Sequence, residues 1–158
     1  MFERFTKDAR LVVTHAVEEA ESRGDTRIGT EHLLIGVARS PTLESLMPDV
    51  ESLRAELDHM DREALASVGL DPELIELAGP ARHRKTAHIP FTSGAKDILK
   101  GALRAALDLG HRHIGVEHIA IALTAIEGPD RATGMLHGLD LDPEAVRAVL
   151  LRHTRQAS

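Results

Sequence analysis

The chain has 158 residues, of which 42% are hydrophobic and only three are aromatic, all of them phenylalanine. This length suits one compact domain, or two small halves that share a core, built mainly from aliphatic side chains. The formal net charge of −6 argues against a nucleic-acid binder, which needs a basic face, and the absence of cysteine excludes disulfides, thiolate zinc sites and cysteine nucleophiles.

The first predicted element is an amphipathic helix that begins after Thr6 and ends at Gly24. Thr6 lies where an N-cap belongs, and Gly24 tolerates the left-handed conformation that often follows a helix C-terminus. The apolar residues have the spacing of one helix face: Ala9, Val12, Val13, Ala16, Val17 and Ala20.

A second helix is predicted over the apolar run Leu33–Ala38, which follows Ile28-Gly29-Thr30-Glu31-His32. Periodicity alone does not distinguish this run from a buried strand. Thr30 as N-cap and Glu31 in the first turn, near the positive end of the helix dipole, favour a helix. Because the run has no polar face, we expect this helix to be buried centrally.

Weaker helical signals follow. A short turn is expected at Ser40-Pro41, and an Asp-Pro-Glu helix start occurs at Asp71. Residues 79–90 contain Gly79-Pro80, Pro90 and the basic cluster Arg82-His83-Arg84-Lys85, and they indicate an exposed linker. The helical patterns between these points cover residues 43–46, 50–57 and 60–68.

The chain then repeats itself. Residues 91–124 match residues 5–38 without a gap when they are shifted by 86 positions, the distance from Phe5 to Phe91. The identical pairs include Phe5 and Phe91, Thr6 and Thr92, Ala9 and Ala95, Gly24 and Gly110, Ile28 and Ile114, Gly29 and Gly115, Glu31 and Glu117, and His32 and His118. A binding site that is present in the first copy is therefore expected in the second.

The second copy predicts a helix from Thr92 to Gly110, which carries the same apolar spacing, and a second buried helix around residues 119–123. A turn is expected at residues 127–130 and a short helix at residues 131–137. Asp142-Pro143-Glu144 combines an N-cap with proline in the first turn, so it predicts a last helix that ends near His153.

No segment shows strand alternation, so the fold class is predicted to be all-α. We expect one compact domain of two four-helix repeats in a pseudo-twofold arrangement. The first repeat is expected to span residues 1–78, with additional helical material at about 58–78. The linker is expected at residues 79–90, and the second repeat at residues 91–158.

Several of these motifs resemble one family, the N-terminal domain of ClpC-type unfoldases, which is a double Clp repeat. The motifs appear in the family's order over nearly the whole chain: Met1-Phe2-Glu3-Arg4-Phe5-Thr6, Ile28-Gly29-Thr30-Glu31-His32-Leu33-Leu34, His88-Ile89-Pro90-Phe91-Thr92 and Leu109-Gly110-His111-Arg112-His113-Ile114-Gly115-Val116-Glu117-His118. The resemblance implies a module that receives substrates and adaptor proteins. The chain departs from the family at Val116, where threonine is usual, and at Lys100, where glutamate is common.

The resemblance also implies ligand-binding residues. Glu31 and Glu117 match the glutamates that receive the guanidinium of phosphoarginine in ClpC N-domains, with Thr6, Thr30 and Thr92 at helix starts close to them. A carboxylate can bind a guanidinium in two charge-assisted bonds, and a helix N-terminus attracts phosphate. Phe2, Phe91 and Lys96 match residues that border a groove for cyclic peptide antibiotics. The alternative is structural: each glutamate complements its helix dipole, and each phenylalanine anchors a helix entry.

Other chemistries are weighed against these. His32, His118, His111 and His113 could suggest a metal, but histidines that bond the backbone or pack between the repeats are the preferred interpretation, and no metal or cofactor is expected. The chain has no Gly-x-x-x-x-Gly-Lys-Ser/Thr phosphate loop and no Gly-x-Ser-x-Gly elbow, so we expect neither ATP hydrolysis nor another catalytic activity.

We therefore expect a cytoplasmic recognition module that binds neither membrane nor nucleic acid. Its partners would be proteins or peptides, including arginine-phosphorylated ones, Clp unfoldase or protease components, and cyclic peptide antibiotics. It would act as an adaptor or a decoy for the Clp protease system, either as a free-standing domain or as a piece of something larger. The alternative is a structural or regulatory subunit that docks on the Clp complex without binding cargo.

Overall fold

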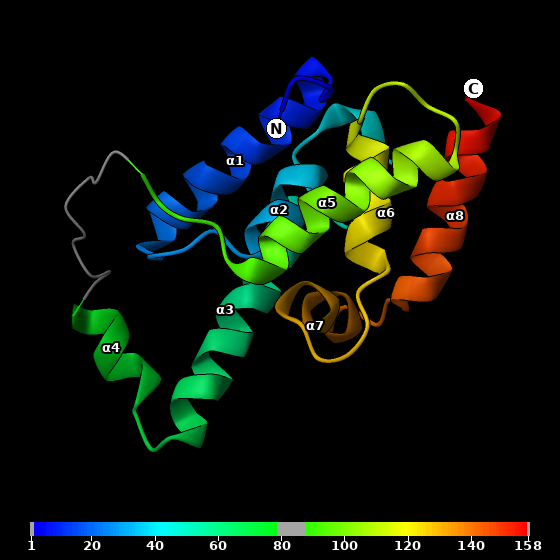
Figure 1. Ribbon diagram of the computed structural model, residues 1–158. Helices are drawn as coiled ribbons and strands as arrows, with labels where there is room; N and C mark the ends of the chain where they lie inside the picture. The colour runs from blue at the N-terminus through cyan, green and yellow to red at the C-terminus, as the bar shows by residue number, and fades with distance from the viewer. Residues whose placement is uncertain (1, 79–87, 158) are drawn as a thin grey trace.

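The computed structural model describes residues 2–78 and 88–157, and Figure 1 shows them as a bundle of helices. Within these ranges there is no strand, only two isolated β-bridges, so the predicted all-α fold is confirmed. The elements are α1 (Lys7–Arg23), α2 (Thr30–Ala38), the 3-10 helix η1 (Pro41–Leu43), α3 (Val50–Ser67), α4 (Pro72–Ala78), α5 (Ser93–Asp108), α6 (Val116–Thr124), α7 (Arg131–Gly138) and α8 (Pro143–Gln156).

The ends of α1 and α5 follow the repeated sequence. The Thr6 hydroxyl accepts the amide hydrogen of Ala9 at 3.1 Å, and the Thr92 hydroxyl accepts that of Ala95 at 3.0 Å. Gly24 and Gly110 follow the helices with φ of 72° and 74°, a conformation that glycine adopts without a steric penalty. Both predicted N-caps and both glycine stops are therefore confirmed.

The central helices α2 and α6 are buried, as predicted, and every residue of α2 is buried. The expected N-cap Thr30 is wrong, because Gly29 is the N-cap and Thr30 is the first helical residue. The side chain that accepts the Gly29 amide hydrogen is His32, through Nδ1 at 2.9 Å. The second copy repeats this arrangement, with the Gly115 amide donating to Nδ1 of His118 at 2.8 Å. A histidine at the third helical position thus bonds back to the N-cap amide, as the third residue of a capping box does.

Two short backbone pairings, related by a pseudo-twofold axis, join the two repeats. Phe5 pairs in parallel with Ile114, and Phe91 pairs in the same way with Ile28. The amides of Thr6 and Thr92 donate to the carbonyls of Ile114 and Ile28, both at 2.9 Å. Each entry into α1 or α5 is therefore bound to the segment that leads into the central helix of the other repeat.

The first repeat differs from the second after its central helix. The helical pattern predicted at residues 43–46 is wrong, because the 3-10 helix ends at Leu43 and a turn follows at residues 44–46. The two patterns at residues 50–57 and 60–68 form one continuous helix, α3, because no proline or glycine interrupts them. Residues 79–87 of the predicted linker lie outside the described ranges.

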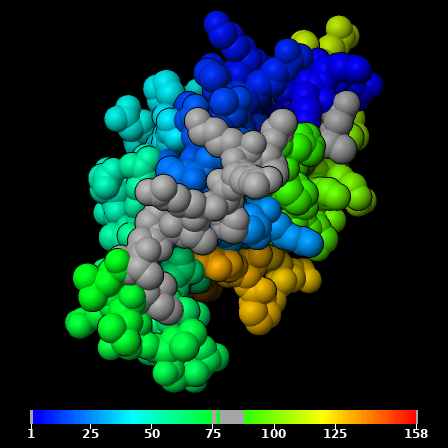
Figure 2. Space-filling model, turned by 90° about the vertical axis from the view of Figure 1, so that its left-hand side faces the viewer, coloured from blue at the N-terminus to red at the C-terminus, as the bar shows by residue number. Residues whose placement is uncertain are grey.

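The end of α3 and the helix α4 form an arm, which projects from the body at the lower left of Figure 2. It carries an exposed set of large apolar side chains: Val68, Leu70, Leu74 and Leu77. Among the described residues, every helix is too short or too polar to cross a bilayer.

Helices α1 and α2 pack closely because α2 contains Gly36. A Cβ atom at Gly36 would lie 2.5 Å from the backbone carbonyl oxygen of Val12, which cannot move without shifting α1. We expect Gly36→Ala to lower the free energy of unfolding by about 1–3 kcal/mol, the usual cost of overpacking a core. Urea denaturation measures this change.

Gly94→Ala is the matched control, because a Cβ atom at that helical glycine would meet its nearest atom at 3.5 Å, an ordinary contact. It should leave the stability unchanged or slightly higher, since alanine favours helix. Equal stabilities of the two variants would contradict the close approach of α1 and α2.

Candidate functional site

The first predicted glutamate lies in a cavity of about 400 Å³, here called the Glu31 site. The first turns of three helices meet there: Gly29, Thr30 and Glu31 of α2, Thr92 and Gly94 at α5, and Asp130 and Arg131 at α7. The structure thus brings together three of the predicted ligand residues, Thr30, Glu31 and Thr92. Helix N-termini attract anions, and the carboxylate attracts cations, so the cavity offers both kinds of group.

The Glu31 carboxylate already has a partner within the chain. Its side chain is 11% exposed, and Oε2 lies 3.2 Å from Nε of Arg131. The Arg131 guanidinium also pairs with Asp61 of α3. A Cβ atom at Gly29 would clash with the Glu31 carboxylate, so glycine at this position lets the carboxylate fold back over the start of α2.

The second predicted glutamate lies in a separate, smaller cavity of about 210 Å³, the Glu117 site. Its walls come from η1 (Thr42 and Leu43), from the end of α8 (His153 and Thr154) with its C-cap Ala157, and from His111. The Glu117 side chain is 27% exposed, more than that of Glu31. A Cβ atom at Gly115 would clash with this carboxylate too, so the local geometry of the two glutamates is the same.

A buried histidine lies behind each glutamate. Nε2 of His32 lies 2.7 Å from Oδ2 of Asp25, and Nε2 of His118 lies 2.8 Å from Nδ1 of His111. Asp25 and His111 are equivalent under the shift of 86 residues. Because Nδ1 of each buried histidine accepts a backbone amide hydrogen, the neutral ring carries its proton on Nε2 and donates it to this partner.

This tautomer argues against a metal centre. His111, Glu117 and His118 bring possible ligand atoms within 4.8 Å of one another. However, the unprotonated nitrogen of His118 is Nδ1, and it already accepts the Gly115 amide hydrogen. The other nitrogen, Nε2, faces His111 and carries the proton. A protonated nitrogen has no lone pair for a metal. The geometry therefore favours the hydrogen-bonded histidine pair.

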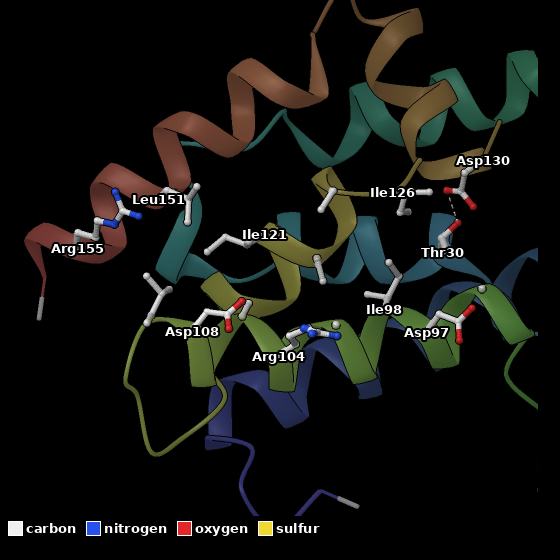
Figure 3. Close-up of a pocket in the computed structure, with 16 residues that line it drawn as sticks. Thr30, Asp97, Ile98, Arg104, Asp108, Ile121, Ile126, Asp130, Leu151 and Arg155 are labelled. Carbon is white, nitrogen blue, oxygen red and sulfur yellow. Dashed lines mark hydrogen bonds between the residues drawn. The ribbon is translucent and has the colours of Figure 1, made fainter. Parts of the chain in front are cut away.

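An apolar groove of about 610 Å³ lies between α5, α6 and α8 (Figure 3). Ile98, Ile121, Ile126 and Leu151 point into it, and charged side chains flank it, with Asp97 and Asp130 toward one end and Arg155 toward the other. In the first repeat, the position equivalent to Ala105 of this groove holds Glu19, which is buried and paired with Arg39 and Arg54. Only the second repeat leaves this face apolar.

The remaining predicted ligand residues lie elsewhere. Thr6 caps α1, and Phe2 packs edge-on against Phe5 with ring centroids 5.2 Å apart. Phe91 is partly buried against the core, and Lys96 is exposed on α5. None of these four residues lines the three cavities described above. Their role in ligand binding stays a prediction.

Arg131, Asp61 and Asp130 are not predicted as site residues from the sequence. Asp130 accepts a hydrogen bond from the Thr30 hydroxyl at 2.8 Å and thereby connects the starts of α2 and α7. Thr30 and Asp130 are 100 residues apart, and both Asp130 and Arg131 lie beyond the matching part of the repeat. The sequence predicts only a turn at residues 127–130 and a helix start at residue 131 here.

Comparison with known proteins finds relatives that are Clp proteins. The chain is 32% identical to the chloroplastic chaperone protein ClpC2 of Oryza sativa and 31% identical to a ClpA homologue of Porphyra purpurea, described as an ATP-dependent Clp protease ATP-binding subunit. Each match covers 96% of this chain but only 15% and 17% of the relative. The chain thus spans about a sixth of these relatives' length. No family model matches it.

Solved structures agree with the fold. The N-terminal domain of the chaperone ClpD from Arabidopsis thaliana superimposes with a TM-score of 0.69, at 25% identity, over 98% of this chain and 97% of that one. The Hsp104 N-terminal domain from Candida albicans gives a TM-score of 0.63 at 16% identity, over 94% and 90% of the two chains, a likeness of fold alone.

The buried histidine of the second repeat predicts a dependence of stability on pH. Burial lowers the pKa of His118 below its ordinary value of 6.5, Glu117 opposes this change and His111 adds to it. Below about pH 6.5 the unfolded state therefore binds a proton that the folded state resists, so the free energy of unfolding should fall as the pH falls. Urea denaturation at pH 7 and pH 5 measures this decrease.

The free energy of unfolding of the His118→Asn variant should decrease less between these two pH values, because the substitution removes the buried titrating group. His15, whose pKa burial also lowers, contributes equally to both proteins and cancels in the comparison. The same decrease in both proteins would contradict the assignment to His118.

Proposed function

Because the chain is homologous to the N-terminal region of ClpC- and ClpA-type proteins and has the Clp N-terminal domain fold, we propose that it is a non-catalytic module that binds arginine-bearing groups of protein ligands. The ligand of choice is a phosphoarginine-like group, bound at the Glu31 and Glu117 sites. The module acts in the cytoplasm as an adaptor or a decoy for the Clp protease system.

The observation that carries the proposal is the guanidinium already bound to Glu31. Arg131 presents Nε to this carboxylate at 3.2 Å, so the site has the charge and the shape to hold an arginine side chain. The Glu117 carboxylate has the same backbone geometry at Gly115 and is more exposed. Both sites are therefore suited to the same chemical group.

A phosphoryl group has a place at the Glu31 site as well. The first turns of α2, α5 and α7 surround the cavity, and Arg27 lies on its wall. Helix N-termini and an arginine attract phosphate, while the nearby carboxylate takes the guanidinium. This separation of charges supports phosphoarginine over plain phosphate, which Glu31 and Asp130 would repel.

Cyclic peptides are a further proposed ligand class, at Phe2, Phe91 and Lys96. Lys96 is exposed, and Phe2 and Phe91 are partly buried, which suits an apolar ligand with a polar edge. This proposal rests on the family resemblance of these residues.

A second candidate function is a docking subunit that binds the Clp complex and takes no cargo. The observation that favours it is the same ion pair, because Arg131 already satisfies Glu31 within the chain. In that case both glutamates would be structural groups at the starts of α2 and α6.

Calorimetric titration with free phosphoarginine separates the two candidates. We expect wild-type protein to bind, and Glu31→Gln and Glu117→Gln each to weaken their own site by about tenfold or more, the usual effect of losing charge-assisted hydrogen bonds. The doubly substituted protein should not bind. Glutamine keeps the shape of the side chain and removes only its charge.

Glu21→Gln serves as the control, because Glu21 is an exposed acid of α1 and lines none of the three cavities. It should bind as the wild type does. Absence of binding at millimolar phosphoarginine, or equal binding by the doubly substituted protein, would contradict the cargo-binding proposal and favour the docking subunit.

A further inference from the structure

We infer that Arg131 is an internal competitor at the Glu31 site: it occupies the carboxylate in the unliganded chain, and an arginine-type ligand must displace it. The inference rests on the proposed function, because it concerns the regulation of the same site. It also makes the two sites unequal, since no arginine is among the described residues that line the Glu117 cavity.

The exposures of the paired groups allow the exchange. The Glu31 side chain is 11% exposed and lies at the start of a buried helix, so its carboxylate stays in place. The Arg131 side chain is 50% exposed, so it can swing into solvent without leaving the surface of α7. An ion pair with one half-exposed partner is weak, and a ligand that adds bonds to a phosphoryl group can replace it.

The backbone of α7 keeps Arg131 beside Glu31. Asp130, the N-cap of α7, accepts hydrogen bonds from the Thr30 hydroxyl at 2.8 Å and from the Ala132 amide at 2.9 Å. The first bond joins the start of α7 to the first turn of α2, and the second caps α7. The arginine therefore returns to the carboxylate whenever the site is empty.

Helix α3 contributes a second partner of the Arg131 guanidinium, because Nη2 of Arg131 pairs with Asp61. It lies close to α7 at two glycines: a Cβ atom at Gly134 would lie 3.1 Å from the end of the Met60 side chain, and one at Gly138 would meet the Glu56 carboxylate. Arg23 at the end of α1 pairs with the second oxygen of Asp61 at 2.9 Å and with Asp58 at 2.8 Å. Asp61 is therefore fixed in position, and it draws Arg131 across the Glu31 site.

The Glu117 site lacks this arrangement. Among the described residues that line its cavity there is no arginine: they are Thr42, Leu43, His111, Glu117, His153, Thr154 and Ala157. A ligand can approach Glu117 without displacing a guanidinium. We therefore expect the second repeat to bind first and the first repeat to bind only when Arg131 leaves.

The test isolates each site in the whole chain. In a Glu117→Gln background, which leaves only the Glu31 site, Arg131→Gln should tighten the binding of free phosphoarginine by about two- to fivefold, the factor that corresponds to a partly exposed ion pair. In a Glu31→Gln background, Arg131→Gln should leave the affinity of the Glu117 site unchanged. Calorimetry gives the affinities, and circular dichroism checks that each variant is folded.

A second measurement needs no ligand. The NMR signal of the Arg131 Nε–H group should be protected from exchange with water in the wild type and should lose this protection in Glu31→Gln. Asp61→Asn should weaken the protection, because it removes the second anchor of the same guanidinium. Unprotected Nε–H in the wild type would overturn the inference.

The outcomes separate this inference from the proposed function. Binding at the Glu117 site together with tighter binding at the Glu31 site in Arg131→Gln supports both. Binding at the Glu117 site with unchanged or weaker binding at the Glu31 site in Arg131→Gln overturns the competitor and leaves the proposed function intact; a weaker affinity would mean that Arg131 contacts the phosphoryl group. No binding at either site in any variant overturns both.

Discussion

The structure depends on two backbone pairings, each of which joins a residue of one repeat to a residue of the other. The strand-like entry of α1 pairs at Phe5 with Ile114, and the entry of α5 pairs at Phe91 with Ile28. Each pairing places the first turn of an outer helix beside the first turn of a central helix from the other repeat. The Glu31 site follows directly from these pairings, because Thr92 of one repeat and Glu31 of the other line the same cavity. Neither repeat could form this site alone.

Symmetry ends where the copies diverge in sequence. The cap of each central helix is the same, a glycine amide bonded to a histidine, but the histidine is bonded to Asp25 in the first repeat and to His111 in the second. The first repeat fills its outer face with the buried Glu19 and its arginine partners, whereas the second leaves an apolar groove (Figure 3). The equivalent faces of the two repeats thus differ: the first presents charged groups, and the second presents aliphatic side chains. A module of this kind can offer different ligands different faces.

Much of the fold could be predicted from the sequence because its signals are local. The apolar spacing, the Thr6 and Thr92 caps and the two glycine stops all act within one or two helical turns. The N-cap prediction fails at Thr30 because this residue is already helical, and its hydroxyl donates to Asp130, a partner 100 residues away. The partners of the Glu31 site could not be predicted, since Asp61 and Arg131 come from the diverged parts of the two copies and meet only when α3 packs on α7. Contacts between side chains so far apart in the sequence leave no periodic pattern in it.

Native-state hydrogen exchange tests most directly whether the two backbone pairings hold the repeats together. In the described part of the chain, the amides of Thr6, Ile28, Thr92 and Ile114 donate backbone bonds in the two pairings. If the repeats form one cooperative unit, these four amides exchange with the same free energy of opening, equal to that of global unfolding. Rapid exchange of Ile28 and Thr92 while Thr6 and Ile114 remain protected, or the reverse, would show that the repeats open separately and would contradict the account.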